Sequence, residues 1–260
     1  MPLTQSSACQ PFTRTGASSA TDVRVRGRDL VNDLMGGTSF TQMLYFLTCK
    51  RMPTQVQCDV LDACLVTLME HGLTPSAVIT RLMALSVPEE PQVAISSGLL
   101  AIGSVYAGTT EQCAALLIEM EQRVKDGADV ETVSQEIVTR YRQQKRALPG
   151  FGHGTHKPDD PRAQKLFAIA ADHGCADGYV QLLQRLGLAV DQQYGRHITI
   201  NATGAIAALL LEVDIPVAAI RGYSVVSRAA GLVGHYLEEL ENPSGKAIWS
   251  AARQAVPYRE

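Results

Sequence analysis

One stretch of the chain, from Leu148 to Leu166, collects ionisable side chains between two long helical patterns and reads LPGFGHGTHKPDDPRAQKL. Within it, His153 lies between Gly152 and Gly154, and glycines on both sides allow the backbone to adopt positive φ and to approach a ligand closely. A histidine held in such a loop could donate a hydrogen bond or move a proton, because imidazole titrates near neutral pH. Two interpretations fit the pattern: a solvated turn between helices, or a backbone cradle that holds His153 over a substrate.

Other side chains outside and inside this loop could join the same chemistry. His71 ends an amphipathic pattern, where a helix C-terminus favours a cation, although a histidine there is more often a structural hydrogen-bonding residue. Arg228 lies in an otherwise apolar helical pattern, and a buried arginine needs a carboxylate partner from the protein or from a substrate. Arg162 opens the next helix after two aspartates and a proline, and His156 is either an alternative ligand or simply exposed.

The composition excludes several classes of protein. The net charge of −3 argues against a nucleic-acid-binding protein, which normally carries a basic face. Six histidines and six cysteines occur without HExxH, CxxC or mixed ligand spacing, so we expect no metal site and no disulfide framework. No P-loop or GxSxG motif is present, and the apolar runs are too short to span a bilayer. We therefore expect a soluble, cytoplasmic protein.

The elements that must position these side chains are predicted to be helices. Residues 1–22, rich in Ser, Thr, Ala and Gln, predict a flexible arm, and the rest of the chain predicts an all-α fold. Residues 24–53 predict a short helix, a break at Gly36-Gly37 and a second helix capped by Ser39. Further helices are expected at 55–71, 92–120, 128–147, 161–187, 203–213 and 217–240. Alternation of period two is confined to HITIN.

Six segments, in their order and spacing, resemble the citrate synthase family. They are RGRDLVNDLMGGTSFTQMLYFLT, LVTLMEHG, SSGLLAIGS, PGFGHGTHKPDDPRA, INATGAIAALLLEV and SRAAGLVGHYLEE, and they extend from about Arg24 to Pro257. The resemblance is closer to the short branch, which comprises citryl-CoA lyase and the C-terminal module of ATP-citrate lyase. It implies one citrate synthase-like domain over residues 23–260, with a large helical domain and a small helical lobe at about 125–220.

The resemblance also implies an activity and its ligands. Members of the family are homodimers or homotetramers that make or cleave a C–C bond between an acyl-CoA and a carboxylated keto acid. His71 matches the histidine that hydrogen-bonds the thioester carbonyl, and His153 matches the one that contacts the keto or hydroxyl oxygen of the second substrate. Arg162 and Arg228 match positions near substrate carboxylates. Coenzyme A is the implied cofactor, as thioester substrate or product, and its arm is expected along Gly150, Phe151, Gly152 and Gly154.

The sequence departs from the family pattern at four positions, one of which is Gly154, where a basic residue often follows the loop histidine. Thr203 lies where the proton-moving aspartate of an NVDG motif is expected, and a threonine hydroxyl is no base near neutral pH without an activating partner. Tyr106 lies where citrate synthases carry a histidine. Lys246 lies where many members place an arginine that reaches the neighbouring subunit's site.

Three interpretations of these departures remain open. The chain could be a citryl-CoA lyase-type enzyme in which Glu70, Asp159, Asp160 or a water performs the aspartate's task. It could be a divergent enzyme that decarboxylates, hydrolyses or cleaves another carboxylated substrate. It could also be an inactive homologue that binds a ligand or a partner subunit.

Overall fold

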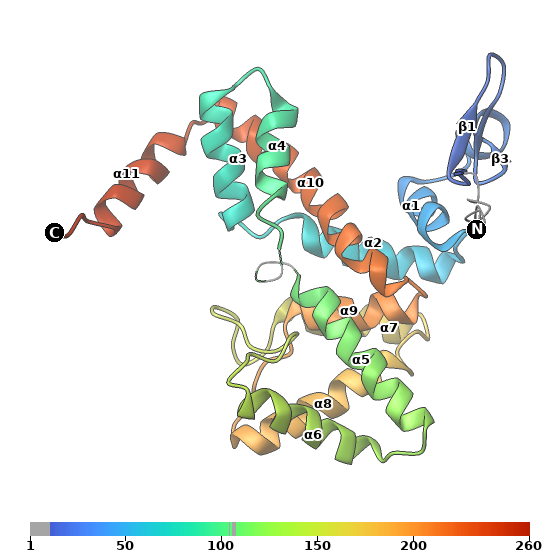
Figure 1. The fold of residues 1–260 in the computed structure, drawn as a ribbon, viewed down its shortest axis with the longest axis vertical. Coiled ribbons are helices and arrows are strands. Elements are labelled where there is room, and N and C mark those ends of the chain that lie inside the picture. Colours follow the sequence, from blue (N-terminus) through green and yellow to red (C-terminus); the bar gives the residue numbers. More distant parts are fainter. Residues whose placement is uncertain (1–10, 104, 106–107) are drawn as a thin grey trace, which may run out of the picture. The chain divides into compact units, whose positions relative to one another are not determined.

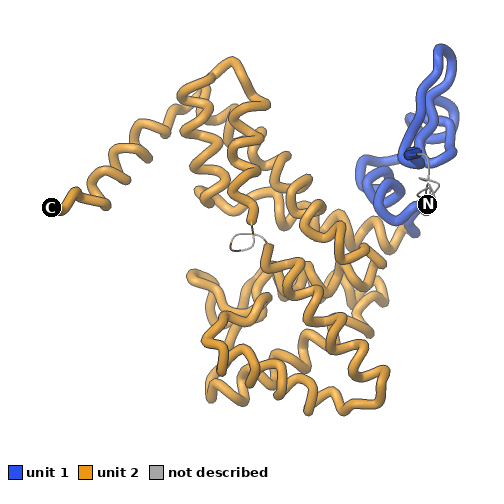
Figure 2. Tube along the Cα trace, in the orientation of Figure 1, with its two compact units in different colours: residues 1–54 blue, residues 55–260 orange. Residues whose placement is uncertain are grey.

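A computed structural model describes residues 11–103, 105 and 108–260. The chain forms two compact units, Met1–Thr54 and Gln55–Glu260 (Figure 2). The residue types that dominate the second unit, alanine and leucine, are strong helix formers, and helices account for nearly all of its regular structure (Figure 1). The predicted all-α class is confirmed.

The first unit contains a small antiparallel sheet. Its strands are β1 (Gly16–Ser18), β2 (Val23–Val25) and β3 (Arg28–Asp29), in the order β1-β2-β3. Arg26 and Gly27 join β2 to β3 with φ of 48° and 84°, which is the two-residue turn that matches the twist of paired strands. The helix expected from residue 24 is therefore wrong for residues 24–29. Residue 22, the predicted end of the N-terminal arm, lies between β1 and β2.

Two short helices complete the first unit. The turn at Leu30–Leu34 is a π-helix, labelled η1, and α1 spans Phe40–Cys49. Ser39 caps α1 as predicted: its hydroxyl accepts from the Gln42 backbone while the Gln42 side chain accepts from the Ser39 backbone. Gly36, with φ of 80°, lies in the predicted break between the two helices.

The second unit contains ten of the helices in the described part of the chain. They are α2 (Gln55–Met69), α3 (Pro75–Ser86), α4 (Pro91–Leu99), α5 (Thr109–Lys125), α6 (Val130–Gln143), α7 (Pro161–Asp172), α8 (Tyr179–Tyr194), α9 (Ala202–Glu212), α10 (Val217–Glu241) and α11 (Gly245–Ala255). The helices expected at 55–71, 128–147, 203–213 and 217–240 correspond to α2, α6, α9 and α10. None of the helices within the described residues combines the length and the apolar character that a membrane crossing requires.

Two expected helices are each divided in two. The pattern at 92–120 breaks between α4 and α5, in a segment that includes Gly103 and Gly108, and glycine is a poor helix former. The pattern at 161–187 breaks after Asp172, because Gly174 adopts φ of 63° and its N–H bonds back to the Ala171 carbonyl. The small apolar residues around the first break continue the helical spacing, so the sequence predicts a helix through it.

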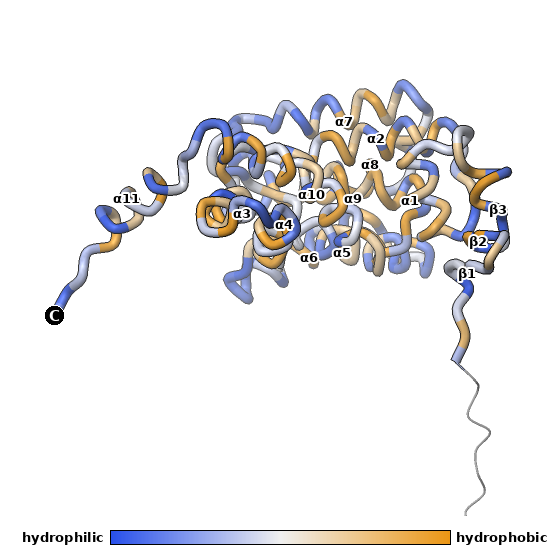
Figure 3. The backbone as a smooth tube through the Cα atoms, turned by 90° about the horizontal axis from the view of Figure 1, so that it is seen from above, coloured by the Kyte–Doolittle hydropathy of each residue, from blue (hydrophilic) through white to orange (hydrophobic). Residues whose placement is uncertain are grey.

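The core of the second unit surrounds α9. Nearly every residue of α9 is buried, which is expected of a helix that is apolar on all sides. It packs against α2, α5, α7 and α8, while α10 packs against α2, α3 and α4. Figure 3 shows hydrophobic residues recurring along these packed helices and hydrophobic and hydrophilic residues alternating along α11. The site described below lies where the N-terminus of α9 meets α2 and α10. The expected small lobe at about residues 125–220 stays a prediction.

Candidate active site

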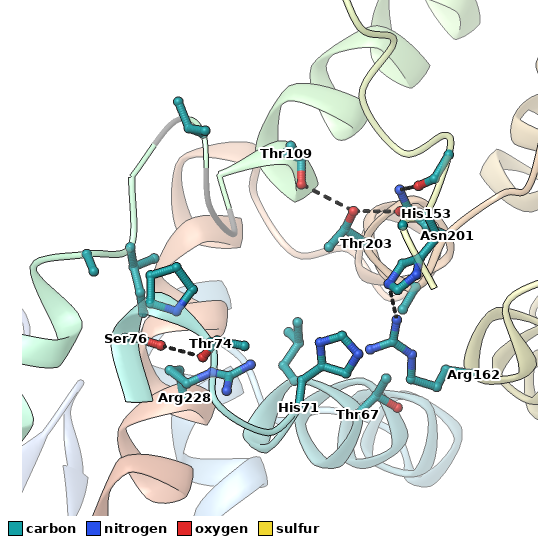
Figure 4. A pocket seen from close by; sticks show the side chains of 18 residues that line it. Thr67, His71, Thr74, Ser76, Thr109, His153, Arg162, Asn201, Thr203 and Arg228 are labelled. Carbon is teal, nitrogen blue, oxygen red and sulfur yellow. Dashed lines mark hydrogen bonds between the residues drawn. The ribbon is translucent and has the colours of Figure 1, made fainter. Parts of the chain in front are cut away.

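A cavity of about 580 Å³ in the second unit gathers most of the predicted site residues (Figure 4). Segments far apart in sequence line it: the end of α2, the start of α3, the connection from α4 to α5, the GFGHG loop, and residues of α7, α9 and α10. The polar and ionisable side chains in its lining are Thr67, His71, Thr74, Ser76, Thr109, His153, Arg162, Asn201, Thr203 and Arg228. The structure thus brings both predicted histidines, both predicted arginines and Thr203 to one place.

His71 follows the last turn of α2, and two contacts fix that turn. A Cβ at Gly231 of α10 would lie only 1.9 Å from the Met69 carbonyl oxygen, so glycine there lets α10 approach the end of α2. The carboxylate of Glu70 accepts a hydrogen bond of 2.8 Å from the backbone N–H of His71. Desolvation, reinforced by the positive charge of Arg162, lowers the pKa of His71. The imidazole is therefore neutral at neutral pH.

The GFGHG loop fixes the tautomer of His153. Its Nδ1 accepts hydrogen bonds from the backbone N–H groups of Thr155 at 3.0 Å and of His156 at 2.9 Å. A nitrogen that accepts hydrogen bonds carries no proton, so we assign the proton of the neutral ring to Nε2. Desolvation lowers the pKa of His153, with smaller contributions from His156 and Arg162. We therefore take Nε2 as an N–H donor; the 3.4 Å approach of Nη2 of Arg162 to Nε2 is then a contact and not a hydrogen bond, because a guanidinium only donates.

Two glycines and an asparagine attach this loop to the N-terminus of α9. A Cβ at Gly204 would lie 2.6 Å from the Gly150 carbonyl oxygen, and Gly150 itself has φ of 87°. The N-cap of α9, Asn201, donates from its backbone to the Gly150 carbonyl at 3.0 Å and from Nδ2 to the Gly152 carbonyl at 2.9 Å. These close contacts and hydrogen bonds hold the loop against the N-terminus of α9, and in this position His153 lines the cavity.

Arg162 is bound by an acid of its own helix start. Asp160 is 0% exposed and accepts from Nε of Arg162 at 3.0 Å, from its Nη2 at 2.8 Å and from the Ala202 backbone at 2.9 Å. Burial alone would raise the pKa of Asp160, but the hydrogen bonds from Arg162 and Ala202 lower it to about 2. The charge of Arg162 is thus balanced within the protein, and two of its three nitrogens are already occupied.

Arg228 has no such partner. Its Nη1 is buried and, among the described residues, has no hydrogen-bond acceptor. Desolvation lowers the pKa of Arg228, and the charge of Glu70 acts in the opposite direction. Leaving a buried donor unsatisfied costs about 1–3 kcal/mol. A guanidinium kept in this state beside a cavity fits an anionic ligand that completes its hydrogen bonds.

Thr203 is not available as a base in this arrangement. Its hydroxyl donates to Oδ1 of Asn201 at 2.7 Å and accepts from the hydroxyl of Thr109 at 3.2 Å. The proton of Thr203 is therefore held by an amide oxygen, which does not activate a hydroxyl for proton abstraction.

Carboxylates are missing from the described lining of the cavity, where no aspartate or glutamate occurs. The three acids considered as substitutes are engaged elsewhere. Asp160 holds Arg162, Asp159 lies 3.1 Å from Nε2 of His197, and Glu70 lies 2.9 Å from Nε2 of His235. A proton-moving carboxylate is therefore not supplied by the described residues around this cavity.

Some predicted residues lie outside the cavity lining. Lys246 is exposed on α11, and Gly150 and Phe151 pack against α9 and its preceding residue Ile200. Tyr106 lies outside the described residues. Sequence reasoning assigned no role to Asn201, although an asparagine just before a helical pattern is an N-cap signal.

Three histidines, His71, His153 and His156, place their ligand atoms within 4.8 Å of one another, which is close enough to hold a metal ion. The hydrogen bonding opposes it. A metal would need the Nε2 lone pair of His153, but that nitrogen carries the proton, and the Arg162 guanidinium lies 3.4 Å away. The residues present thus fit an anion better than a cation.

Known structures share this fold over the full chain. Citryl-CoA lyase from Hydrogenobacter thermophilus matches with a TM-score of 0.85 and 28% identity, covering 97% of this chain and 95% of that one. ATP citrate lyase from Methanothrix soehngenii, solved in complex with citrate and coenzyme A, matches with a TM-score of 0.78 and 18% identity, covering 97% of this chain and 42% of that one. The second likeness concerns the fold alone.

Sequence relatives agree with the structures. Citrate synthase of a Synechocystis strain is 26% identical over 208 residues, which are 77% of this chain and 49% of the relative. Probable ATP-citrate synthase of Dictyostelium discoideum is 24% identical over 203 residues, 71% of this chain and 31% of the relative. The chain thus spans half or less of these two relatives. Residues 13–250 match the family model described as "Citrate synthase, C-terminal domain". The protein therefore belongs to the citrate synthase family.

Proposed function

We propose that this protein is an acyl-CoA carbon–carbon lyase of citryl-CoA lyase type. It makes or cleaves the bond between the α-carbon of an acyl-CoA and the carbonyl carbon of a carboxylated keto acid. The observation that carries the proposal is the convergence of His71, His153 and an unpaired Arg228 on one cavity. The end-to-end likeness to a citryl-CoA lyase supports the same conclusion.

Each of these side chains has a role that its chemistry fits. His71 donates to the thioester carbonyl and stabilises the enolate that develops there. His153 donates from Nε2–H to the keto or hydroxyl oxygen of the acid. Arg228 binds a carboxylate of that acid, with the free nitrogen of Arg162 as a second contact. Fixed donors of this kind act strongly because they are already oriented when charge appears on oxygen.

The ligands and the assembly follow from the same proposal. Coenzyme A enters as thioester substrate or product, with its arm beside Gly152 and Gly154, which line the cavity. The protein is a cytoplasmic homodimer or homotetramer that binds no metal, nucleic acid or membrane. Lys246 serves a neighbouring subunit, in keeping with its exposed position on α11.

Two measurements test this function. Incubation with acetyl-CoA in deuterated solvent reports enolate formation as loss of methyl protons, and citryl-CoA cleavage reports the C–C step. We expect both with the native protein and neither with His71→Ala. A protein that binds no citryl-CoA, coenzyme A or citrate in calorimetry would contradict the proposal.

One observation favours a second candidate. Because the described lining lacks a carboxylate, a substrate that forms its enolate without proton abstraction would suit the cavity. A thioester with a carboxylate on its α-carbon does so: the C–CO₂⁻ bond breaks, CO₂ leaves, and the electron pair becomes the enolate. Release of CO₂ from malonyl-CoA, without proton exchange on acetyl-CoA, would favour this decarboxylation over the lyase.

A further inference from the structure

Proton transfer at the thioester α-carbon requires a base and a hydrogen-bond donor at the same time. The described lining supplies donors in abundance, but its hydroxyl at Thr203 and its imidazole at His153 hold their protons toward other groups or toward the cavity. His71 is assigned to the thioester oxygen by the proposed function. A separate lone pair near the cavity is therefore needed.

His156 offers such a lone pair. Its ring centroid lies 4.4 Å from that of His153 and 6.0 Å from that of His71, and its ligand nitrogen lies within 4.8 Å of theirs. Among the described residues, none forms a hydrogen bond with its ring, although its backbone N–H is fixed by His153. The imidazole is half-buried and is not itself part of the cavity lining, but its uncommitted nitrogen lies beside the two histidines that line the cavity.

We propose that His156 is the base that moves the α-proton, in place of a carboxylate. In this step a ring nitrogen of His156 forms an N–H bond as the α C–H bond breaks. The C–H electron pair becomes the C=C bond of the enolate, and the carbonyl π pair moves onto the oxygen that His71 hydrogen-bonds. In the cleavage direction the hydroxyl of the acid portion loses its proton to neutral His156 as the C–O⁻ becomes the keto C=O. The C–C bond then breaks, its electron pair becomes the enolate, and the His156 imidazolium gives that proton to the enolate carbon. This inference rests on the proposed function.

The charges that face His156 are compatible with this role. On its own loop it faces the neutral ring of His153, and from the end of α2 it faces the neutral ring of His71. From the start of α7, the guanidinium of Arg162 approaches the neighbouring ring of His153 and is balanced by Asp160. Neither ring that His156 faces carries a positive charge that would repel the imidazolium formed in the step.

The three-residue spacing between His153 and His156 explains how one loop can supply both the hydrogen-bond donor and the base. The backbone N–H of His156 locks Nδ1 of His153 as an acceptor, and the side chain of His156 then stacks beside the same ring with an interplanar angle of 31°. Substitution of the His156 side chain leaves that backbone hydrogen bond in place. The base can thus be removed without changing the tautomer of His153.

The test compares His156→Gln with the native protein and with His173→Gln, a histidine at the end of α7 outside the cavity lining. Deuterium exchange on acetyl-CoA is measured from pH 5 to 9, and citryl-CoA affinity is measured in parallel. We expect His156→Gln to lower the exchange rate about 10²- to 10⁴-fold, the usual worth of a positioned base, with affinity unchanged. Added imidazole, or the second substitution Thr203→Asp, should restore part of the exchange.

Each outcome decides between the inference and the function on which it rests. If the native protein exchanges protons and His156→Gln exchanges them equally fast, His156 is not the base, but the proposed function stands. If His156→Gln loses citryl-CoA affinity together with exchange, the side chain serves binding and the inference is wrong. If the native protein neither exchanges protons nor cleaves citryl-CoA, the proposed function fails first.

Discussion

Replacing Arg228 by methionine should make the protein more stable and its site weaker. Methionine fills much of the same volume without a charge, so the variant removes a guanidinium nitrogen that is buried without a protein acceptor. An unsatisfied buried donor costs about 1–3 kcal/mol, and removal of that cost should raise the free energy of unfolding by a similar amount. For a chain of this size the melting temperature rises by roughly 2–4 °C for each kcal/mol.

Affinity should change in the opposite direction. A hydrogen bond between charged partners contributes about 1.5–3 kcal/mol. Its loss should therefore increase the dissociation constant for the carboxylated ligand by roughly 10- to 150-fold. Thermal melts of the free variant and calorimetric titration with citrate measure the two effects separately. Proton exchange on acetyl-CoA alone should change much less, because Arg228 is assigned to the acid and not to the thioester.

Arg140 provides a matched control on α6. Its Nη1 and Nη2 lie 2.8 Å from the two carboxylate oxygens of Glu119, and it does not line the cavity. Arg140→Met should therefore leave citrate affinity unchanged and lower stability by about 0–1 kcal/mol, as for other half-exposed ion pairs. The reasoning is refuted if Arg228→Met lowers the melting temperature as Arg140→Met does, or if it leaves citrate affinity at the native value.

Three further predictions follow from the geometry of the site. Gly204→Ala should destabilise the protein by about 1–3 kcal/mol and lower turnover, because its Cβ would meet the loop carbonyl 2.6 Å away; Gly222→Ala, with open space around it, should be neutral or stabilising in the same melts. Since the pKa values of His71 and His153 are lowered by burial, the unfolded chain binds more protons as the pH falls through about 6.5. His197, whose pKa is raised by Asp191 and Asp159, acts in the opposite direction, so the prediction is a difference: in urea titrations His71→Gln and His153→Gln should each lose less stability than the native protein between pH 7 and pH 5. Asp160→Asn should cost roughly 1.5–3 kcal/mol in urea titrations, because it removes the charge that balances the neighbouring guanidinium.

Local rules predicted some of the fold well. The Ser39 cap depends on residues three positions apart, and the sequence shows both of them. The turn at Arg26 and Gly27 was missed because an arginine with φ of 48° has no signal of its own; the paired strands on either side impose that conformation. The interruption between α4 and α5 was missed because small residues keep the helical spacing even where the helix ends.

The site was predictable only as a set of residues. The resemblance to a family assigned His71, His153, Arg162 and Arg228, and the structure places them around one cavity. The sequence could not predict which of these side chains have a charged partner, because this depends on how distant segments of the chain pack. The sequence DDPRA did not reveal which aspartate holds Arg162, nor that Arg228 would remain without a partner.

The charge balance of the cavity narrows the chemistry that it can support. Its described lining contains neutral imidazoles, a balanced Arg162 and an unbalanced Arg228, with no carboxylate to oppose an incoming anion. Carboxylates, enolates and alkoxides all place negative charge on oxygen, and each would gain from these donors. A carboxylate base becomes a neutral acid when it takes the α-proton and leaves the enolate without a counter-charge, whereas a neutral imidazole becomes a cation as the enolate becomes an anion. Replacement of an acid by an imidazole such as His156 is thus electrostatically consistent with a site that binds an acidic substrate through one free guanidinium.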